Sequence, residues 1–173
     1  MRLRSLRALL GVFFGALVSS GVMMRPAAAQ APALLAIGAG VFDINDDESA
    51  GAVSGEYLFS DRLWLLGPLL GVMVTFDGGV YAYGGFGLDL VFGGRWAVTP
   101  SLAAGLYGEG GGKDLGSVVE FRSGVQIAYR FDDDSRLGLL FHHISNAGLD
   151  DRNPGANTLM LTYSIPLGAA GAK

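Results

Sequence analysis

Apolar and polar side chains alternate over residues 117–131, and this alternation limits the fold more than any other feature of the sequence. One parity carries Val119, Phe121, Ser123, Val125, Ile127, Tyr129 and Phe131. The other parity carries Glu120, Arg122, Gly124, Gln126, Ala128 and Arg130. Side chains two residues apart lie on the same face of a β-strand. The segment therefore predicts a strand with one apolar face and one charged or small face.

The same alternation recurs along the chain, and helical periodicity is hard to find after Gln30. Turn-forming sequences rich in Gly, Asp and Asn separate the alternating segments at even spacing. They include Asn45-Asp46-Asp47, Asp77-Gly78-Gly79, Gly110-Gly111-Gly112 and Asp132-Asp133-Asp134. Eight strands are predicted, near residues 35–44, 51–59, 63–76, 80–92, 95–108, 117–131, 136–146 and 158–167.

Two architectures suit eight such strands. A soluble sandwich or lipocalin-like barrel would bury the apolar face, whereas a membrane barrel would turn that face toward lipid. Half of the residues are hydrophobic, only 16% are charged and 28 are glycine. A soluble surface needs more charge than this, and glycines on the polar parity suit the narrow lumen of an eight-stranded barrel. We therefore predict an all-β fold, an eight-stranded antiparallel outer-membrane β-barrel.

The first residues of the chain have the pattern of a secretory signal. Arginines at the start precede an uncharged run over residues 8–24, and residues 27–29 are all alanine. A basic start, an apolar middle and a small-residue end are the three parts of a signal peptide. The alternative is a membrane-anchor helix, for which the run is slightly short. The sequence predicts a cleaved signal over residues 1–29, a single barrel domain over 30–173 and export to the outer membrane of a Gram-negative cell.

Composition excludes several classes of function. The chain has no cysteine, which rules out a disulfide scaffold, a thiolate zinc site and a catalytic cysteine. A net charge of −4 with 12 Lys and Arg argues against a nucleic-acid partner. His142 and His143 are adjacent, so a strand places them on opposite faces and they provide no metal site. The glycine-rich segments 84–87 and 110–113 do not match cofactor-binding loops. We expect no cofactor and no metal.

One polar pair lies at the end of the seventh predicted strand. His143 and Ser145 share a parity with Leu137, Leu139 and Phe141, which is the lipid-facing parity by composition. Side chains at i and i+2 are about 6.6–7 Å apart at Cα, so an imidazole nitrogen can reach the serine hydroxyl. Such a pair supplies a nucleophile and a general base. The alternative is that both are ordinary polar residues of the membrane interface.

The wider sequence resembles the lipid A 3-O-deacylase family of the PagL type. The resemblance extends from Phe141 to Tyr163. It rests on two motifs, His143-Ile144-Ser145-Asn146-Ala147-Gly148 and Asn153-Pro154-Gly155, placed before the last strand. It implies an eight-stranded outer-membrane esterase in which His143 is the base and Ser145 the nucleophile. It also implies that oxyanion donors come from the same stretch, with Asn146, Asn153 and the Gly148 N–H as candidates.

The chain departs from the family pattern in two places. The family has a Glu twelve residues after the Ser, which orients the His, but here that position is Asn157. An Asn can hold an imidazole tautomer, although it does not offset imidazolium charge as a carboxylate does. Asp150 and Asp151 are the alternative orienting residues. The tail from Leu167 also lacks the terminal aromatic residue usual in outer-membrane barrels.

Two functions of different classes follow. The first is a carboxylic-ester hydrolase that removes an ester-linked acyl chain, by the resemblance the 3-O chain, from lipid A. The second is a non-enzymatic small barrel for adhesion or envelope structure. The outward His143 and Ser145 favour the first, because polar groups facing lipid are costly unless they are used. Expected partners are lipopolysaccharide as substrate and membrane lipid, with a homodimer left open.

Overall fold

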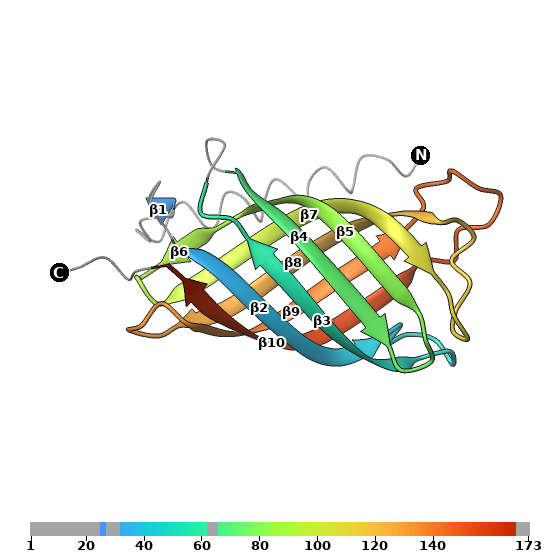
Figure 1. Ribbon diagram of the computed structural model, residues 1–173, viewed down its shortest axis with the longest axis horizontal. Helices are drawn as coiled ribbons and strands as arrows, with labels where there is room; N and C mark the ends of the chain where they lie inside the picture. The colour runs from blue at the N-terminus through green and yellow to red at the C-terminus, as the bar shows by residue number, and fades with distance from the viewer. Residues whose placement is uncertain (1–24, 27–31, 62–65, 169–173) are drawn as a thin grey trace, which may run out of the picture.

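The computed structural model describes residues 25–26, 32–61 and 66–168, and its antiparallel strands close into a barrel (Figure 1). The barrel strands are β2 (Ala33–Phe42), β3 (Ala50–Leu58), β4 (Leu66–Thr75), β5 (Val80–Leu88), β6 (Leu90–Phe92), β7 (Trp96–Gly108), β8 (Val119–Arg130), β9 (Arg136–Ser145) and β10 (Ala156–Leu167). A short β1 (Arg25–Pro26) pairs with β6.

Consecutive barrel strands pair with each other except for β5 and β6, and β10 pairs with β2 to close the sheet. The closing register sets Leu159 opposite Val41. β5 and β6 both pair with β7 and together take one strand position in the barrel. The eight-stranded antiparallel barrel predicted from the alternation is therefore confirmed. No helix long and apolar enough to cross a membrane occurs among the described residues.

Two details differ from the predicted strands. The predicted strand 80–92 is interrupted at Asp89, a buried residue whose carboxylate pairs with Arg136 across the barrel. The last strand begins at Ala156, so Asn157 lies inside it and not in the preceding loop. Main-chain hydrogen bonding extends the strand, because the Ile44 N–H donates to the Asn157 carbonyl at 2.9 Å. The start of the predicted strand 63–76 falls partly outside the described residues.

The predicted signal over residues 1–29 lies outside the described residues except for Arg25 and Pro26. It therefore stays a prediction, as does the division of the chain at residue 30.

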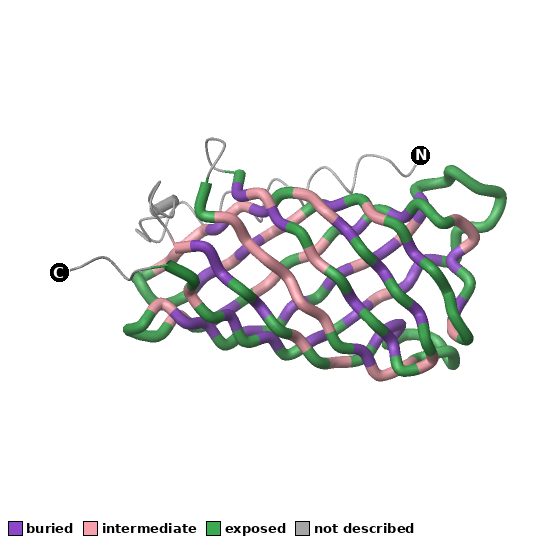
Figure 2. Tube along the Cα trace, viewed as in Figure 1, coloured by how far each residue is buried: buried purple, intermediate pink, exposed green. Residues whose placement is uncertain are grey.

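Burial alternates along the strands as the sequence predicts, and exposed and buried positions follow one another around the barrel (Figure 2). The outer face is apolar: Leu102 is 69% exposed and Leu161 56% exposed. The inner face carries the charged side chains Glu120 and Arg122, both fully buried. An apolar outside and a polar inside are the arrangement of a barrel that faces lipid.

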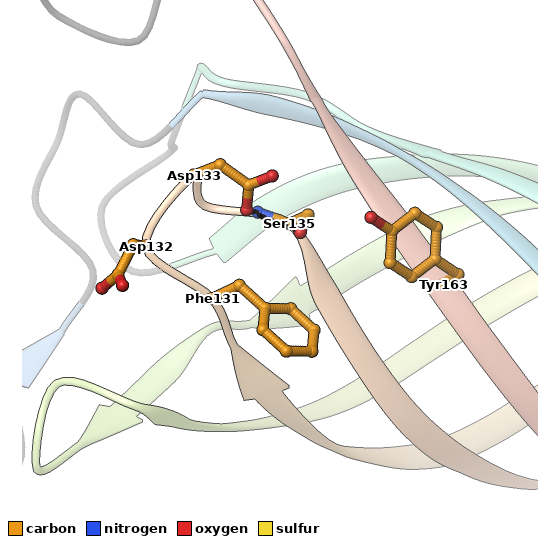
Figure 3. Close-up of a pocket in the computed structure, with 5 residues that line it drawn as sticks. All are labelled: Phe131, Asp132, Asp133, Ser135 and Tyr163. Carbon is orange, nitrogen blue, oxygen red and sulfur yellow. Dashed lines mark hydrogen bonds between the residues drawn. The ribbon is translucent and has the colours of Figure 1, made fainter.

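The two ends of the barrel differ. Segments 43–49, 109–118 and 146–155 form longer connections at one end, here called the loop end. The other end, here called the turn end, has the tight connections 93–95 and 131–135. Short turns face the periplasm and longer loops the exterior in barrels of this kind. A hollow of about 450 Å³ opens at the turn end between Phe131, Ser135 and Tyr163 (Figure 3), remote from the polar residues of the loop end.

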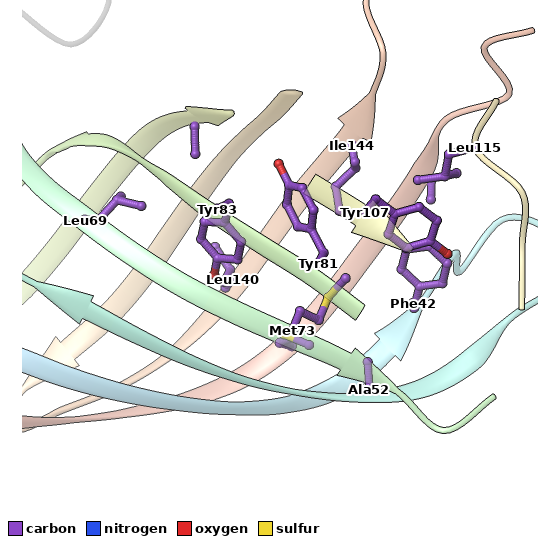
Figure 4. Packing of buried hydrophobic residues seen from close by; sticks show 13 residues of the cluster. Phe42, Ala52, Leu69, Met73, Tyr81, Tyr83, Tyr107, Leu115, Leu140 and Ile144 are labelled. Atoms are coloured by element: carbon purple, nitrogen blue, oxygen red, sulfur yellow. The ribbon is translucent and has the colours of Figure 1, made fainter. Parts of the chain in front are cut away.

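Aromatic and aliphatic side chains pack in the lumen (Figure 4). Paired charged side chains also lie there. The Tyr83 hydroxyl donates to Glu56 at 3.0 Å, and Arg122 lies 3.3 Å from the same carboxylate. Gly71 makes room for this cluster, because a Cβ there would lie 2.5 Å from the Tyr83 ring. An interior filled by side chains is the arrangement expected of an eight-stranded barrel.

Candidate active site

His143 lies on the outer face of β9, close to the loop end. Its cross-strand neighbours are Ser123 on β8 and Asn157 on β10. The side chain is half-buried, whereas the adjacent His142 points into the lumen and is only 3% exposed. The alternation therefore predicted the faces of both histidines correctly.

Asn157 meets the imidazole directly. Its Oδ1 atom lies 2.9 Å from His143 Nδ1, and its Nδ2 donates to Asn45 Oδ1 at 3.1 Å. An amide oxygen accepts hydrogen bonds and does not donate them, so Nδ1 carries the proton in this contact. The lone pair of the neutral ring is then on Nε2, the nitrogen that can serve as a base.

Gly155 shapes the other side of the ring. It adopts a positive φ of 64°, which L side chains rarely adopt. A Cβ at this position would lie 2.8 Å from His143 Cε1 and 3.2 Å from Nε2. The imidazole therefore packs directly over the glycine, and only a residue without a side chain leaves it that space.

Ser145 is on the same outer face as His143, two residues further along β9, opposite Phe121 on β8. It is half-buried. Among the described residues, no hydrogen bond joins Ser145 Oγ to the imidazole. The two side chains are neighbours by strand geometry, about 6.6–7 Å apart at Cα. Catalytic hydrogen bonds in an enzyme without substrate are often long and tighten only in the complex.

The predicted oxyanion residues hold the loop after β9. Asn146 is fully buried, and its Nδ2 donates to the main-chain carbonyls of Leu115 at 3.2 Å and Arg152 at 2.7 Å. Its Oδ1 accepts the Gly148 N–H at 2.9 Å, and its own N–H donates to Asn153 Oδ1 at 3.1 Å. Asn146 and the Gly148 N–H are thus engaged in loop contacts, whereas no bond within the described residues uses the side-chain N–H groups of Asn153.

The two alternative orienting residues are not at the imidazole. Asp150 and Asp151 are exposed on the loop, where the Asp151 N–H donates to Asp150 Oδ1 at 2.7 Å. Neither makes a hydrogen bond to His143 in the described part of the chain. No group of His, Asp or Glu side chains that could hold a metal ion occurs among the described residues.

A buried lysine anchors the loop behind Asn157. Lys113 forms ion pairs with Asp43 and, at 2.9 Å, with Asp46. Burial alone would lower the pKa of Lys113, but its hydrogen bonds to the two carboxylates raise that pKa above its ordinary value. The hydrogen bond from Lys113 lowers the pKa of Asp46. Asp43 Oδ1 also accepts the Asn157 N–H at 3.4 Å, so the ion pairs tie this loop to the strand that carries Asn157.

Sequence reasoning did not identify Asn45, Ser123 or Lys113 as parts of this site. The strand register reveals Ser123, because alignment of β8 against β9 sets it opposite His143. Asn45 belongs to a sequence read only as a turn, and it reaches Asn157 because the first and last barrel strands pair. If the register between the first and last barrel strands had been assigned from the sequence, it would have located Asn45.

Comparison with known proteins agrees with the fold. The sequence profile described as "Lipid A 3-O-deacylase (PagL)" matches residues 78–166, just over half of the chain. The match includes all strands from β5 to β9 and most of β10, and with them His143, Ser145 and Asn157. The protein is thus of the class of outer-membrane barrels, with a polar site on its lipid-facing surface. The chain belongs to the lipid A 3-O-deacylase (PagL) family.

Individual relatives match this chain over a short stretch or at low sequence identity. The chain is 35% identical to the lipid A deacylase PagL of Bordetella bronchiseptica over 52 residues, which are 30% of this chain and 29% of that protein. It therefore aligns with under a third of that relative's length. The crystal structure of the outer membrane enzyme PagL superposes with a TM-score of 0.66 at 18% identity, covering 78% of this chain and 99% of that one. A de novo designed transmembrane β-barrel gives a TM-score of 0.59 at 9% identity, covering 79% and 95%. These two likenesses concern the fold.

Proposed function

We propose that this protein is an esterase that hydrolyses an ester-linked acyl group of lipid A. The acyl group removed is the one at the 3-O position. The observation that carries the proposal is the contact between His143 Nδ1 and Asn157 Oδ1, on the lipid-facing surface beside Ser145. An imidazole held with its Nε2 lone pair available has a use next to a hydroxyl. A structural barrel gains nothing from placing that pair toward lipid.

In the proposed mechanism, Ser145 Oγ attacks the acyl carbonyl while His143 Nε2 takes the hydroxyl proton. The carbonyl π electrons move to oxygen and form a tetrahedral oxyanion. When this intermediate collapses, the C–O bond to the sugar breaks and the His143 proton passes to the leaving sugar oxygen. Water then attacks the carbonyl of the acyl-enzyme while His143 Nε2 takes its proton. The bond between the acyl carbon and Ser145 Oγ breaks, His143 returns the proton to Oγ, and the fatty acid is released.

The oxyanion requires N–H donors near Ser145. Asn146, Gly148 and Asn153 remain the candidates, and Asn153 is the one with side-chain N–H groups outside the loop contacts described above. The position of the site supports lipid A as substrate, because the loop end of an outer-membrane barrel meets the outer leaflet. The signal peptide predicted over residues 1–29 fits the same export route.

The test uses the purified barrel in detergent micelles with lipid A. The wild type is expected to release the ester-linked acyl chain as free fatty acid and to take up one equivalent of a serine-directed phosphonate on the peptide that contains Ser145. A folded barrel that releases no fatty acid and takes up no phosphonate would instead support a non-enzymatic role in adhesion or envelope structure.

A further inference from the structure

We infer that Asn45 is a positioning residue that orients the Asn157 amide and thereby sets the tautomer of His143. The inference rests on the proposed function for its meaning in catalysis. Its structural basis is two hydrogen bonds that link three residues. Asn157 Nδ2 donates to Asn45 Oδ1 at 3.1 Å, and Asn157 Oδ1 faces His143 Nδ1 at 2.9 Å.

An amide in this position needs an orienting partner, whereas a carboxylate does not. Both oxygens of a carboxylate accept hydrogen bonds, so either one can receive the His143 Nδ1–H. An amide has one accepting end and one donating end. If the Asn157 side chain turned over, Nδ2 would donate to Nδ1 and the imidazole proton would move to Nε2. That ring could not accept the proton of Ser145.

Asn45 supplies the acceptor that favours the productive orientation. Its oxygen receives the donating end of the Asn157 amide, which leaves the accepting end toward His143. Asn45 is exposed and lies on the loop that follows β2. The loop is held on both sides of Asn45, because Lys113 pairs with Asp43 and with Asp46. The Ile44 N–H also bonds the Asn157 carbonyl at 2.9 Å.

Three single variants test the inference in the full-length barrel. Asn45→Ala removes the acceptor, and we expect kcat to fall about 2- to 10-fold, the range of a single hydrogen bond, with KM unchanged. Asn45→Asp keeps an acceptor and removes the donor, so we expect at least wild-type activity. Asp47→Ala is the matched control on the same loop, since its side chain is exposed and takes no part in the chain of hydrogen bonds. We expect it to leave activity unchanged.

A carboxylate at position 157 should make Asn45 dispensable. In an Asn157→Asp background we expect Asn45→Ala to have no effect on kcat. An equal loss from Asn45→Ala in both backgrounds would overturn the inference, because a merely structural role of Asn45 does not depend on the group at position 157. Equal loss from Asn45→Ala and Asn45→Asp would overturn it as well.

The imidazole tautomer gives a readout that needs no turnover. We expect the ¹⁵N chemical shifts of His143, assigned with His143→Asn, to show a proton on Nδ1 in the wild type. In Asn45→Ala we expect them to shift toward protonation on Nε2, and in Asn45→Asp to stay as in the wild type. If the barrel hydrolyses no lipid A but the tautomer responds in this way, the proposed function fails and the positioning role stands. If lipid A is hydrolysed and the tautomer does not respond, the positioning role fails alone.

Discussion

Asn157 Oδ1 and His143 Nδ1 lie 2.9 Å apart across the β9–β10 pair, on the lipid-facing surface of the barrel. The family resemblance leads one to expect a glutamate at position 157. The amide reproduces one of its two roles, because it accepts the imidazole N–H and fixes the ring. It does not offset the charge of the imidazolium that forms when His143 takes a proton. At this contact Asn157 therefore matches a glutamate in geometry and is weaker in electrostatics.

Substitution of Asn157 separates these two roles. Asn157→Ala should lower fatty-acid release from lipid A about 10- to 1000-fold, because the tautomer is no longer held. Asn157→Glu should maintain or raise the rate, because a carboxylate stabilises the imidazolium. Release of fatty acid by the purified variants measures both effects. A fully active Asn157→Ala would place the orienting group elsewhere, and Asp150 and Asp151 would be tested next.

Gly155→Ala should displace the imidazole. The added Cβ would lie 2.8 Å from His143 Cε1, so we expect kcat to fall by about tenfold or more, as a misplacement of about 1 Å can cost still more. Gly93→Ala is the matched control, because Gly93 also has a positive φ, of 55°, but nothing lies near its added Cβ. Both variants should lose some stability, and only Gly155→Ala should lose activity. Equal activities for the two would refute the packing of the imidazole on Gly155.

The two histidines should respond oppositely to mutation. His143→Asn should abolish hydrolysis, since an unassisted serine is a poor nucleophile at neutral pH. His142→Asn should be close to wild type in activity, because His142 faces the lumen on the other side of β9. Initial rates of fatty-acid release provide the comparison. An essential His142 with a dispensable His143 would mean that the register of β9 is shifted by one residue.

The ion pairs of Lys113 should make the stability of the loop end depend on pH. The pKa of Asp46 is lowered in the folded protein by its hydrogen bond to Lys113. A lowered pKa contributes stability above the ordinary aspartate pKa, about 4, and that contribution is lost as pH falls through the folded value. The pKa of Lys113 is raised, so its contribution is present below its ordinary value and lost only as pH rises through the folded value.

Lys113→Met tests this coupling. At pH 7 the variant leaves Asp43 buried without its cation, and we expect a loss of about 3–5 kcal/mol in the free energy of unfolding. At a pH below the folded pKa of Asp46 the difference from the wild type should shrink. Heat-modifiable gel mobility of the barrel, measured at both pH values, reports the unfolding temperature. If the unfolding temperatures of wild type and Lys113→Met differed by the same amount at both pH values, the ion pairs would not be the cause of the difference.

Much of the fold could be predicted because the two faces of a lipid-facing strand differ in polarity, and this difference is visible as alternation in the sequence. The apolar parity of β8 lies outside and the parity of Glu120 and Arg122 lies inside, as the alternation indicates. The placement of His143 on the outer face followed from the same argument. The interruption at Asp89 was not evident from the local pattern, and the partner of Asp89 in its buried ion pair, Arg136, is distant in sequence.

The rest of the site depends on contacts between distant strands. Asn157 could be singled out by its spacing from Ser145, but its place inside β10 results from hydrogen bonds to the loop after β2. Asn45 reaches it only because the barrel closes. Asn146 was predicted from the motif, yet its fully buried amide bonds the carbonyls of Leu115 and Arg152 and thereby joins two loops.

The most direct measurement is the mass spectrum of lipid A from Gram-negative cells that lack a deacylase of their own and express this chain. Cells with the wild type should show lipid A lighter by one ester-linked acyl chain. Cells with Ser145→Ala should show unmodified lipid A. Heat-modifiable gel mobility should show that the variant barrel is folded in the outer membrane. Unmodified lipid A with a folded wild type, or the same loss of mass with Ser145→Ala, would contradict hydrolysis by Ser145.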